Sequence, residues 1–92
     1  MIYAIEHGSE YYPSELIMVS DTLQICVDAV NNHENYPYMG DFIIVSVWED
    51  NKKIAISETK GNREVELWDD ATVEFITTPL TVEEIKEHWK TL

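Results

Sequence analysis

The sequence predicts a single acidic α+β domain over residues 1–92, built from a mainly antiparallel β-sheet of about five or six strands with two helices packed on one face. Apolar stretches rich in Val, Ile and aromatic residues recur at short intervals between turn signals. Only two segments repeat their apolar residues at helical spacing. The expected order is ββαββββα, and the short turns between successive strands favour antiparallel pairing.

The first half of the chain is expected to form a hairpin and then a helix. Met1–Glu6 and Glu15–Ser20 have the composition of strands, with Gly8-Ser9 ending the first and the loop Tyr11-Tyr12-Pro13 joining them. Ser20 or Asp21 is suited to cap the helix, and Asp21 with Gln24 has the spacing of a capping-box variant. The apolar stripe of this helix should face the sheet and consists of Leu23, Cys26, Val27 and Val30.

The second half is expected to supply four strands and a final helix. Phe42–Trp48 is apolar on both alternating faces, which places it centrally in the sheet, and Asp50-Asn51 is a tight hairpin signal. The next strands are expected at Lys53–Ser57, Glu64–Trp68 and Thr72–Ile76, with turns at Lys60-Gly61-Asn62 and Asp69-Asp70. Thr81 and Glu84 form a capping box for the last helix, whose apolar face carries Val82, Ile85 and Trp89.

The charge of the chain is distributed unevenly. Up to Asn51 there are nine carboxylates and no lysine or arginine, whereas all six cations follow among nine further carboxylates, and the net charge is −12. Unpaired carboxylates repel one another and destabilise the compact state, so a chain that keeps so many is expected to use their field. This pattern indicates a binding protein with a cationic partner and disfavours direct nucleic-acid or membrane binding.

Signals for catalysis are absent from the sequence. The three histidines are scattered, the only cysteine is Cys26 on an apolar helix face, and no phosphate-binding, calcium or nucleophile motif occurs. Paired carboxylates could serve acid–base chemistry only in a water-excluding cleft, for which so small a domain has little room. We therefore expect no enzyme activity, no catalytic residues, no metal and no cofactor, with Cys26 as a buried inert thiol.

The aromatic residues divide into two groups. Those in apolar-periodic positions are expected in the core: Tyr3, Phe42, Trp48, Trp68, Phe75 and Trp89. Four tyrosines beside prolines lie in expected loops: Tyr11, Tyr12, Tyr36 and Tyr38. These loop tyrosines either form a protein–protein interface, where tyrosine is enriched, or simply cover the ends of the sheet.

The carboxylates could imitate the phosphates of DNA if they gather on one side of the fold. Most of them recur every four to eight residues at expected turns, strand ends and helix surface, while Glu64 and Glu66 share one face of a strand about 6.6–6.8 Å apart. The candidate partner-binding carboxylates are Glu6, Glu10, Glu15, Asp21, Asp28, Glu34, Asp41, Glu49, Asp50, Glu64 and Glu66.

A family resemblance agrees with that hypothesis. The opening MIYAIEHGSEYYPSE and the acidic turns Trp48-Glu49-Asp50-Asn51 and Trp68-Asp69-Asp70 make the chain similar to the small anti-restriction proteins of tailed phages, of the anti-restriction nuclease (Arn) type. The resemblance implies a homodimeric DNA mimic that blocks the DNA-binding surface of a host restriction endonuclease of the McrBC kind. The cluster Lys52, Lys53, Lys60 and Arg63 departs from a uniformly acidic mimic and would have to lie on its back or be neutralised by Glu58, Glu64 and Glu66.

The leading hypothesis is thus a DNA-mimicking inhibitor of a restriction endonuclease or another DNA-binding protein. The alternative is a different interaction module or inhibitor that docks through the loop tyrosines, and an enzyme ranks third. No apolar run is long enough for a membrane span, and the N-terminus lacks the features of a signal peptide. A single cysteine fits a reducing compartment, so a cytoplasmic location is expected, in the bacterial host if the protein is phage-encoded.

Overall fold

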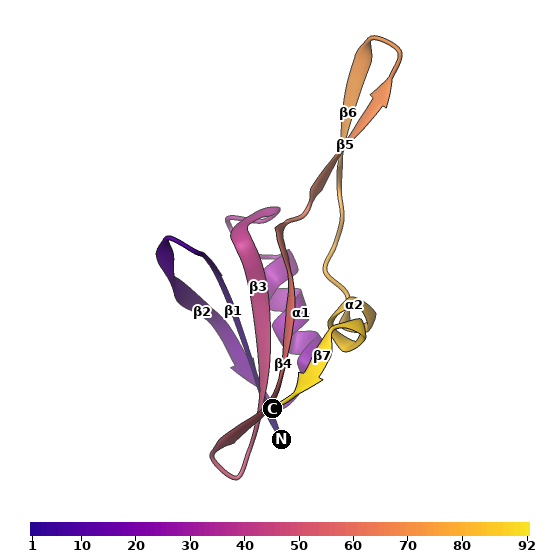
Figure 1. Cartoon of the computed structure of the whole chain (residues 1–92). Coiled ribbons are helices and arrows are strands. Elements are labelled where there is room, and N and C mark those ends of the chain that lie inside the picture. The colour runs from indigo at the N-terminus through magenta and orange to yellow at the C-terminus, as the bar shows by residue number, and fades with distance from the viewer.

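The computed structural model describes residues 1–92 as a five-stranded antiparallel sheet, two helices and a separate two-stranded hairpin (Figure 1). The elements in chain order are β1 (Ile2–Ser9), β2 (Tyr12–Ser20), α1 (Leu23–Asn31), β3 (Tyr38–Glu49), β4 (Lys52–Asn62), β5 (Glu64–Asp69), β6 (Thr72–Thr77), α2 (Val82–Glu87) and β7 (Trp89–Thr91). The main sheet has the order β2-β1-β3-β4-β7, while β5 pairs only with β6. The predicted α+β class, antiparallel pairing and central position of Phe42–Trp48 are confirmed.

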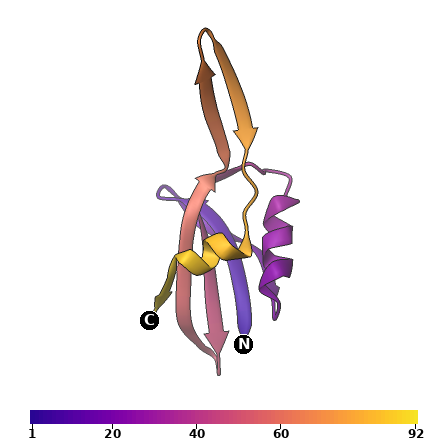
Figure 2. The same ribbon diagram turned by 90° about the vertical axis from the view of Figure 1, so that its right-hand side faces the viewer.

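One face of the main sheet forms the core with both helices. Ile5 lies opposite Val45 on the neighbouring strand, and both are buried together with Ile43. These residues pack against the predicted apolar stripe of α1, against Ile85 of α2 and against Leu80. Both helices therefore belong to one hydrophobic cluster. Figure 2 shows α1 standing on one side of the sheet and α2 crossing beside β4. The expectation that both helices cover the same face is confirmed.

The opposite face of the main sheet has no covering layer. Apolar side chains of β2 and β3 are exposed there, including Leu16, Val19 and Trp48. Directly opposed strand residues share a face, so the register also places Lys53, Lys60 and Lys90 on this side, opposite Trp48, Phe42 and Ile56 respectively. The Nζ of Lys53 lies 5.4 Å from the centroid of the Trp48 ring, and the Trp48 indole N–H donates to Ser46 Oγ at 3.0 Å.

The hairpin between β3 and β4 turns as its sequence predicts. Asp50 and Asn51 have φ angles of 51° and 66°, so both central residues are left-handed. Such two-residue turns match the twist of the flanking strands, and Asp and Asn tolerate this backbone conformation better than most residues. The turn forms one end of the molecule (Figure 1).

Several predicted boundaries are wrong. Gly8-Ser9 does not end the first strand, because β1 continues to Ser9, and β2 and β3 begin earlier than expected, at Tyr12 and Tyr38. Lys60-Gly61-Asn62 is no turn but the end of β4, which continues alongside β3. The last helix ends at Glu87, and Trp89 belongs to β7, because pairing with Ala55–Ser57 supplies backbone partners for the edge of β4. The N-cap of α1 is Thr22 without a side-chain hydrogen bond, and Gln24 donates to Asp28 at 2.9 Å instead of closing a capping box. The capping box of α2 is confirmed in part, since Thr81 Oγ1 accepts from the Glu84 N–H at 3.1 Å.

The predicted burial of two aromatic residues is also wrong. Trp68 is 72% exposed and Phe75 is 56% exposed, because β5 and β6 form a hairpin of their own that no other layer covers. Trp48 is exposed in part on the open face, whereas Tyr3 and Trp89 pack against the core as expected. The molecule measures 55 × 27 × 23 Å, longer than the roughly 32 Å expected for a compact domain of this length.

The three glycines of the chain meet at one place on three adjacent strands. Gly40 has a φ of 82°, and a Cβ on it would lie 2.7 Å from the carbonyl oxygen of Gly8. A Cβ on Gly61 would lie 2.3 Å from the carbonyl oxygen of Gly40, whereas one on Gly8 would come no closer than 3.1 Å to Ser14. The close approach of β1, β3 and β4 beside the root of the β5–β6 hairpin therefore requires the absence of side chains at Gly40 and Gly61.

Replacing Gly61 by alanine is expected to lower the free energy of unfolding by about 3 kcal/mol, because the new methyl group must displace backbone rather than a movable side chain. Gly8→Ala is the matched control and should cost about 1 kcal/mol, since its contacts are only slightly too close. Urea denaturation of the two variants measures both values. Equal losses would contradict the proposed backbone contact.

Candidate functional site

The hairpin of β5 and β6 projects from the end of the main sheet, opposite the β3–β4 turn and both chain termini (Figures 1 and 2). We call residues Glu64–Thr77 the arm. Its strands pair from Glu64 with Thr77 to Asp69 with Thr72, and a two-residue turn of Asp70 and Ala71 closes it. Asp70 has a φ of 50°, as Asp50 does in the other turn. A two-stranded hairpin without a covering layer is only marginally stable in water, so packing against the core does not explain why the arm is present.

The arm combines negative charge with exposed apolar surface. It has five carboxylates and no lysine or arginine; the carboxylates are Glu64, Glu66, Asp69, Asp70 and Glu74. Six large apolar side chains are exposed along it: Val65, Leu67, Trp68, Val73, Phe75 and Ile76. One face carries the pairs Trp68–Val73 and Glu66–Phe75, so that aromatic rings alternate with carboxylates there. Natural proteins rarely leave such a ribbon uncovered unless another molecule binds it.

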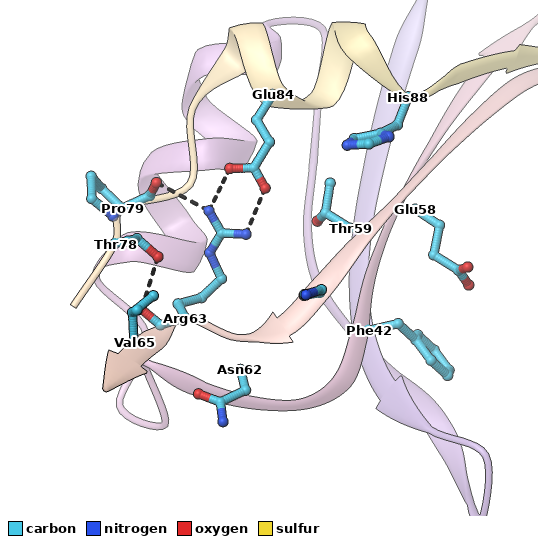
Figure 3. A pocket seen from close by; sticks show the side chains of 11 residues that line it. Phe42, Glu58, Thr59, Asn62, Arg63, Val65, Thr78, Pro79, Glu84 and His88 are labelled. Carbon is cyan, nitrogen blue, oxygen red and sulfur yellow. Dashed lines mark hydrogen bonds and ion pairs between the residues drawn. The ribbon is translucent and has the colours of Figure 1, made fainter. Parts of the chain in front are cut away.

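Arg63 fixes the root of the arm from inside the protein. Its side chain is only 6% exposed, and its two terminal nitrogens donate to the carboxylate of Glu84 at 2.6 and 2.5 Å (Figure 3). One of them also donates to the carbonyl oxygen of Pro79 at 3.2 Å. This fork–fork geometry is the strongest form of a side-chain ion pair. It joins the end of β4, the segment after β6 and the first turn of α2.

Backbone hydrogen bonds complete the root. The N–H of Arg63 donates to the Pro37 carbonyl at 2.8 Å, and the N–H of Thr78 donates to the Arg63 carbonyl at 2.7 Å. The Tyr36 hydroxyl donates to the carbonyl of Thr78, and the Tyr38 hydroxyl donates to the Glu64 carboxylate. The arm is thus held where it leaves the domain, and beyond Glu64 it is free of the main sheet.

The ion pair shifts the protonation equilibria of its members. Its hydrogen bonds hold the pKa of Glu84 below the ordinary 4.5 in spite of partial burial, and they raise the pKa of Arg63. The hydrogen bond to Glu64 raises the pKa of the Tyr38 hydroxyl. Both charges of the Arg63–Glu84 pair are therefore present at neutral pH.

A groove of about 580 Å³ lies beside this root, between β4, α2 and the base of the arm (Figure 3). Lys60 and His88 line it together with Glu58, so its charges are mixed. The Arg63 guanidinium beneath it is occupied by Glu84 and Pro79, and only its Nε has no hydrogen-bond partner. The groove offers no convergent set of acids, bases or nucleophiles for a reaction.

The predicted carboxylates do not share one face. Glu49 and Asp50 lie at the β3–β4 turn, at the opposite end of the molecule from the arm. Glu6 projects from the open face of the main sheet beside Ile44, whereas Asp28 projects from α1 on the helix side. Asp41 Oδ2 accepts from the Glu10 N–H at 3.4 Å, which brings these two acids together. The others are scattered over Glu15 on β2, Asp21 before α1 and Glu34 in the loop after α1, and only Glu64 and Glu66 lie together, on one face of the arm.

The carboxylates are largely free of cationic partners. Arg63 forms an ion pair with Glu84, and His7 Nε2 lies 3.6 Å from Glu15 Oε2. None of the five lysines takes part in an ion pair. Of the two alternatives given for the cationic cluster, neutralisation by Glu58, Glu64 and Glu66 is therefore not the one found. Arg63 is satisfied by Glu84, and Lys53 and Lys60 lie on the open sheet face.

The four tyrosines expected in loops are not equivalent, and the expectation is wrong for two of them, since Tyr12 begins β2 and Tyr38 begins β3. Tyr11 and Tyr12 at the β1–β2 hairpin are 86% and 75% exposed, and Tyr38 is exposed beside the root of the arm. Tyr36 is half-buried and packs against the core. Only the first three could therefore meet a partner without rearrangement, and only Tyr11 and Tyr12 lie next to each other.

Sequence reasoning missed part of this site. Asp69, Asp70 and Glu74 were not among the candidate carboxylates, and Trp68 was assigned to the core. A signal was present in the pattern Trp–acid–Asp, which occurs at Trp48-Glu49-Asp50 and again at Trp68-Asp69-Asp70. Both copies form the turn of a hairpin at an end of the molecule (Figure 1).

The remaining chemistry-bearing groups form no cluster. Cys26 is buried as predicted, and burial raises the pKa of its thiol. No three His, Cys, Asp or Glu side chains come together as ligands for a metal ion. Neither helix has the length and apolar character needed to cross a membrane. Comparison with known proteins finds no matching family model, no curated relative and no similar solved structure.

Replacing Glu84 by glutamine is expected to lower the free energy of unfolding at pH 7 by about 3 kcal/mol, because it leaves the buried Arg63 charge without a counterion. The pKa of Glu84 is lowered by folding, so its contribution is complete above about 4.5 and is lost as the pH falls through the folded pKa. The gap between wild type and Glu84→Gln should therefore close in acid. Denaturation of both proteins at pH 7 and at low pH measures this.

Glu83→Gln is the matched control, since Glu83 is an exposed neighbour on the same helical turn without an ion pair. It should change stability by less than about 0.5 kcal/mol at either pH. A Glu84→Gln gap that stays constant down to low pH would exclude the ion pair as its cause.

Proposed function

We propose that the protein is a non-catalytic inhibitor that occupies the DNA-binding site of another protein, with the carboxylates of the arm in the place of backbone phosphates. The density of charge on the arm supports this. Six residue pairs give the arm a length of about 20 Å at ~3.4 Å per residue. A duplex of that length carries about 12 phosphates, roughly six of them on one side. The arm has five carboxylates in all, with Glu64 and Glu66 on one face, Asp69 and Glu74 on the other and Asp70 in the turn, so its charge is a little under half that of the duplex.

The rest of the molecule extends the same field. Of the 18 carboxylates only Glu84 is neutralised by an arginine or lysine, and both ends of the 55 Å long molecule carry acidic turns. Three of the six cations lie on the open sheet face, and a fourth, Arg63, is buried. A cationic surface that approaches the arm would therefore meet carboxylates before it met a lysine. Such a field also speeds the encounter.

The resemblance to Arn-type anti-restriction proteins names a concrete target. It suggests a phage protein that acts in the bacterial cytoplasm on a modified-cytosine-dependent endonuclease of the McrBC kind, as a homodimer. The carboxylates predicted from the sequence, from Glu6 to Glu66, would then contribute to one general field, since they lie on different faces. The arm would make the closest contacts.

A second candidate function has one observation in its favour. Tyr11 and Tyr12 are the most exposed aromatic residues of the chain, and tyrosine supplies contact area at low entropic cost. An interaction module that docks through the β1–β2 hairpin would use its negative charge for solubility alone. Its binding would depend little on ionic strength.

DNA cleavage by a McrBC-like endonuclease should be inhibited by the protein at ~50 mM salt and much less at ~200 mM, because screening weakens the contacts of exposed charges. We expect the inhibition constant to rise at least about tenfold over this range. Inhibition that is equally strong at both salt concentrations would contradict DNA mimicry. Failure to inhibit at either concentration would exclude this target.

Replacing carboxylates of the arm by amides should weaken inhibition more than replacing carboxylates on another surface. The combined variant Glu66→Gln, Asp69→Asn and Asp70→Asn is expected to lose about tenfold in affinity or more, and asparagine keeps the left-handed turn at position 70 accessible. The comparison variant removes two exposed carboxylates of α2 by Glu83→Gln and Glu87→Gln, and the affinity lost per charge removed is compared between the two variants. If Tyr11→Ser with Tyr12→Ser weakens inhibition more than the arm variant does, the second candidate function is favoured.

A further inference from the structure

The aromatic side chains of the arm give its binding a second component beside charge. Trp68 lies opposite Val73 at the far end of the arm, and Phe75 lies one pair closer to the root on the same face. The register makes Trp68 and Phe75 diagonal neighbours, so both rings belong to one face of the arm. The carboxylates of Glu64 and Glu66 belong to this same face, and Asp69 and Asp70 follow Trp68 directly.

The equivalent tryptophan at the other end of the molecule shows what is special about Trp68. Trp48 precedes the same kind of acidic turn, but Lys53 covers its ring and its indole N–H is bonded to Ser46. Trp68 has no cation over its ring and no hydrogen bond from its indole. Its neighbours on the arm are apolar or acidic. The ring is therefore displayed to solvent among unpaired carboxylates.

We infer that the arm binds a cationic groove that also contains a stacking site for an unpaired base, with Trp68 in the place of that base. Proteins that bind single strands, or that take a base out of the duplex, combine a cationic track for the backbone with aromatic or apolar surfaces for the base. An aromatic ring between carboxylates presents the same two features in the same order. This inference rests on the proposed function, and it names the class of DNA-binding site that the inhibitor fits.

Other occupants of the arm agree less well with its charge. A second copy of the chain carries a net charge of −12, and its exposed lysines lie on a face that also bears Glu6 and Glu58. Nucleic acid and anionic lipid would be repelled by five carboxylates without a cation among them. A cationic protein surface is the partner that complements both the charge and the aromatic rings.

Two short peptides of equal charge test the inference without any endonuclease. One consists of Lys-Lys-Trp repeats and offers cations with stacking rings, and the other consists of Lys-Lys-Ser repeats and offers cations alone. Titration of the full chain, followed by the backbone amide signals in NMR, should show at least about tenfold tighter binding of the Trp peptide. The perturbed amides should lie between Glu64 and Thr77. Equal affinity for the two peptides, or perturbation mainly at other sites, would overturn the inference.

Two substitutions of exposed aromatic residues by serine distinguish binding at the arm from binding elsewhere on the surface. Trp68→Ser should reduce the affinity for the Trp peptide to that for the Ser peptide. Tyr11→Ser removes another exposed aromatic ring beside a carboxylate and should leave the affinity for the Trp peptide unchanged. Neither side chain is in the core, so both variants should keep the unfolding temperature of the wild type. An unchanged affinity of Trp68→Ser for the Trp peptide would contradict the proposal. So would a dimer of the protein alone that Trp68→Ser dissociates, because a second copy would then be the occupant of the arm.

The peptide result and the endonuclease result can fail independently. Preference for the Trp peptide without inhibition of DNA cleavage would remove the proposed target class but keep the arm as a cation- and ring-binding element. Inhibition without that preference would keep DNA mimicry and reduce the arm to a carrier of charge.

Discussion

The ion pair between Arg63 and Glu84 is the interaction on which the position of the arm depends. Arg63 ends the main sheet, Glu84 begins the last helix, and the arm leaves and re-enters the domain between them. The Arg63 side chain is only 6% exposed and that of Glu84 is 28% exposed, and the fork geometry fixes both partners. A buried pair of this kind contributes less to net stability than to the choice of one conformation. Here that conformation is the direction in which the arm projects.

The core and the arm contribute differently to stability. The residues of the main hydrophobic cluster lie in the main sheet, in the two helices and, with Leu80, in the segment between the arm and α2. The arm contributes no residue to that cluster. We therefore expect substitutions in the arm to have little effect on folding. The opposite holds for Gly40 and Gly61, where β1, β3 and β4 approach too closely for a side chain.

The fold could be predicted from the sequence to the extent that local patterns determine it. Apolar periodicity places α1 and β3, and Asp50-Asn51 places a turn, because these signals act within a few residues. The separation of the arm could not be predicted in this way. Its alternating residues resemble those of a half-buried strand, and no signal within a few residues indicates that β5 and β6 pair only with each other and that no layer covers them. For the same reason Trp68 was expected inside, and the carboxylates that share the arm with Glu66 were overlooked.

The two acidic turns offer an internal comparison within one chain. Both place an aspartate with positive φ directly after a tryptophan and another acid. At the β3–β4 turn Lys53 covers the tryptophan, and the pair lies on a sheet that is anchored in the core. At the end of the arm, no cation covers the tryptophan of this sequence pattern, and its two strands do not belong to the main sheet. The Trp68 ring thus stays free for the stacking site that we assign to the partner, whereas Lys53 already occupies the ring of Trp48. The two turns share a sequence pattern, but only one of the two tryptophans has an intramolecular partner.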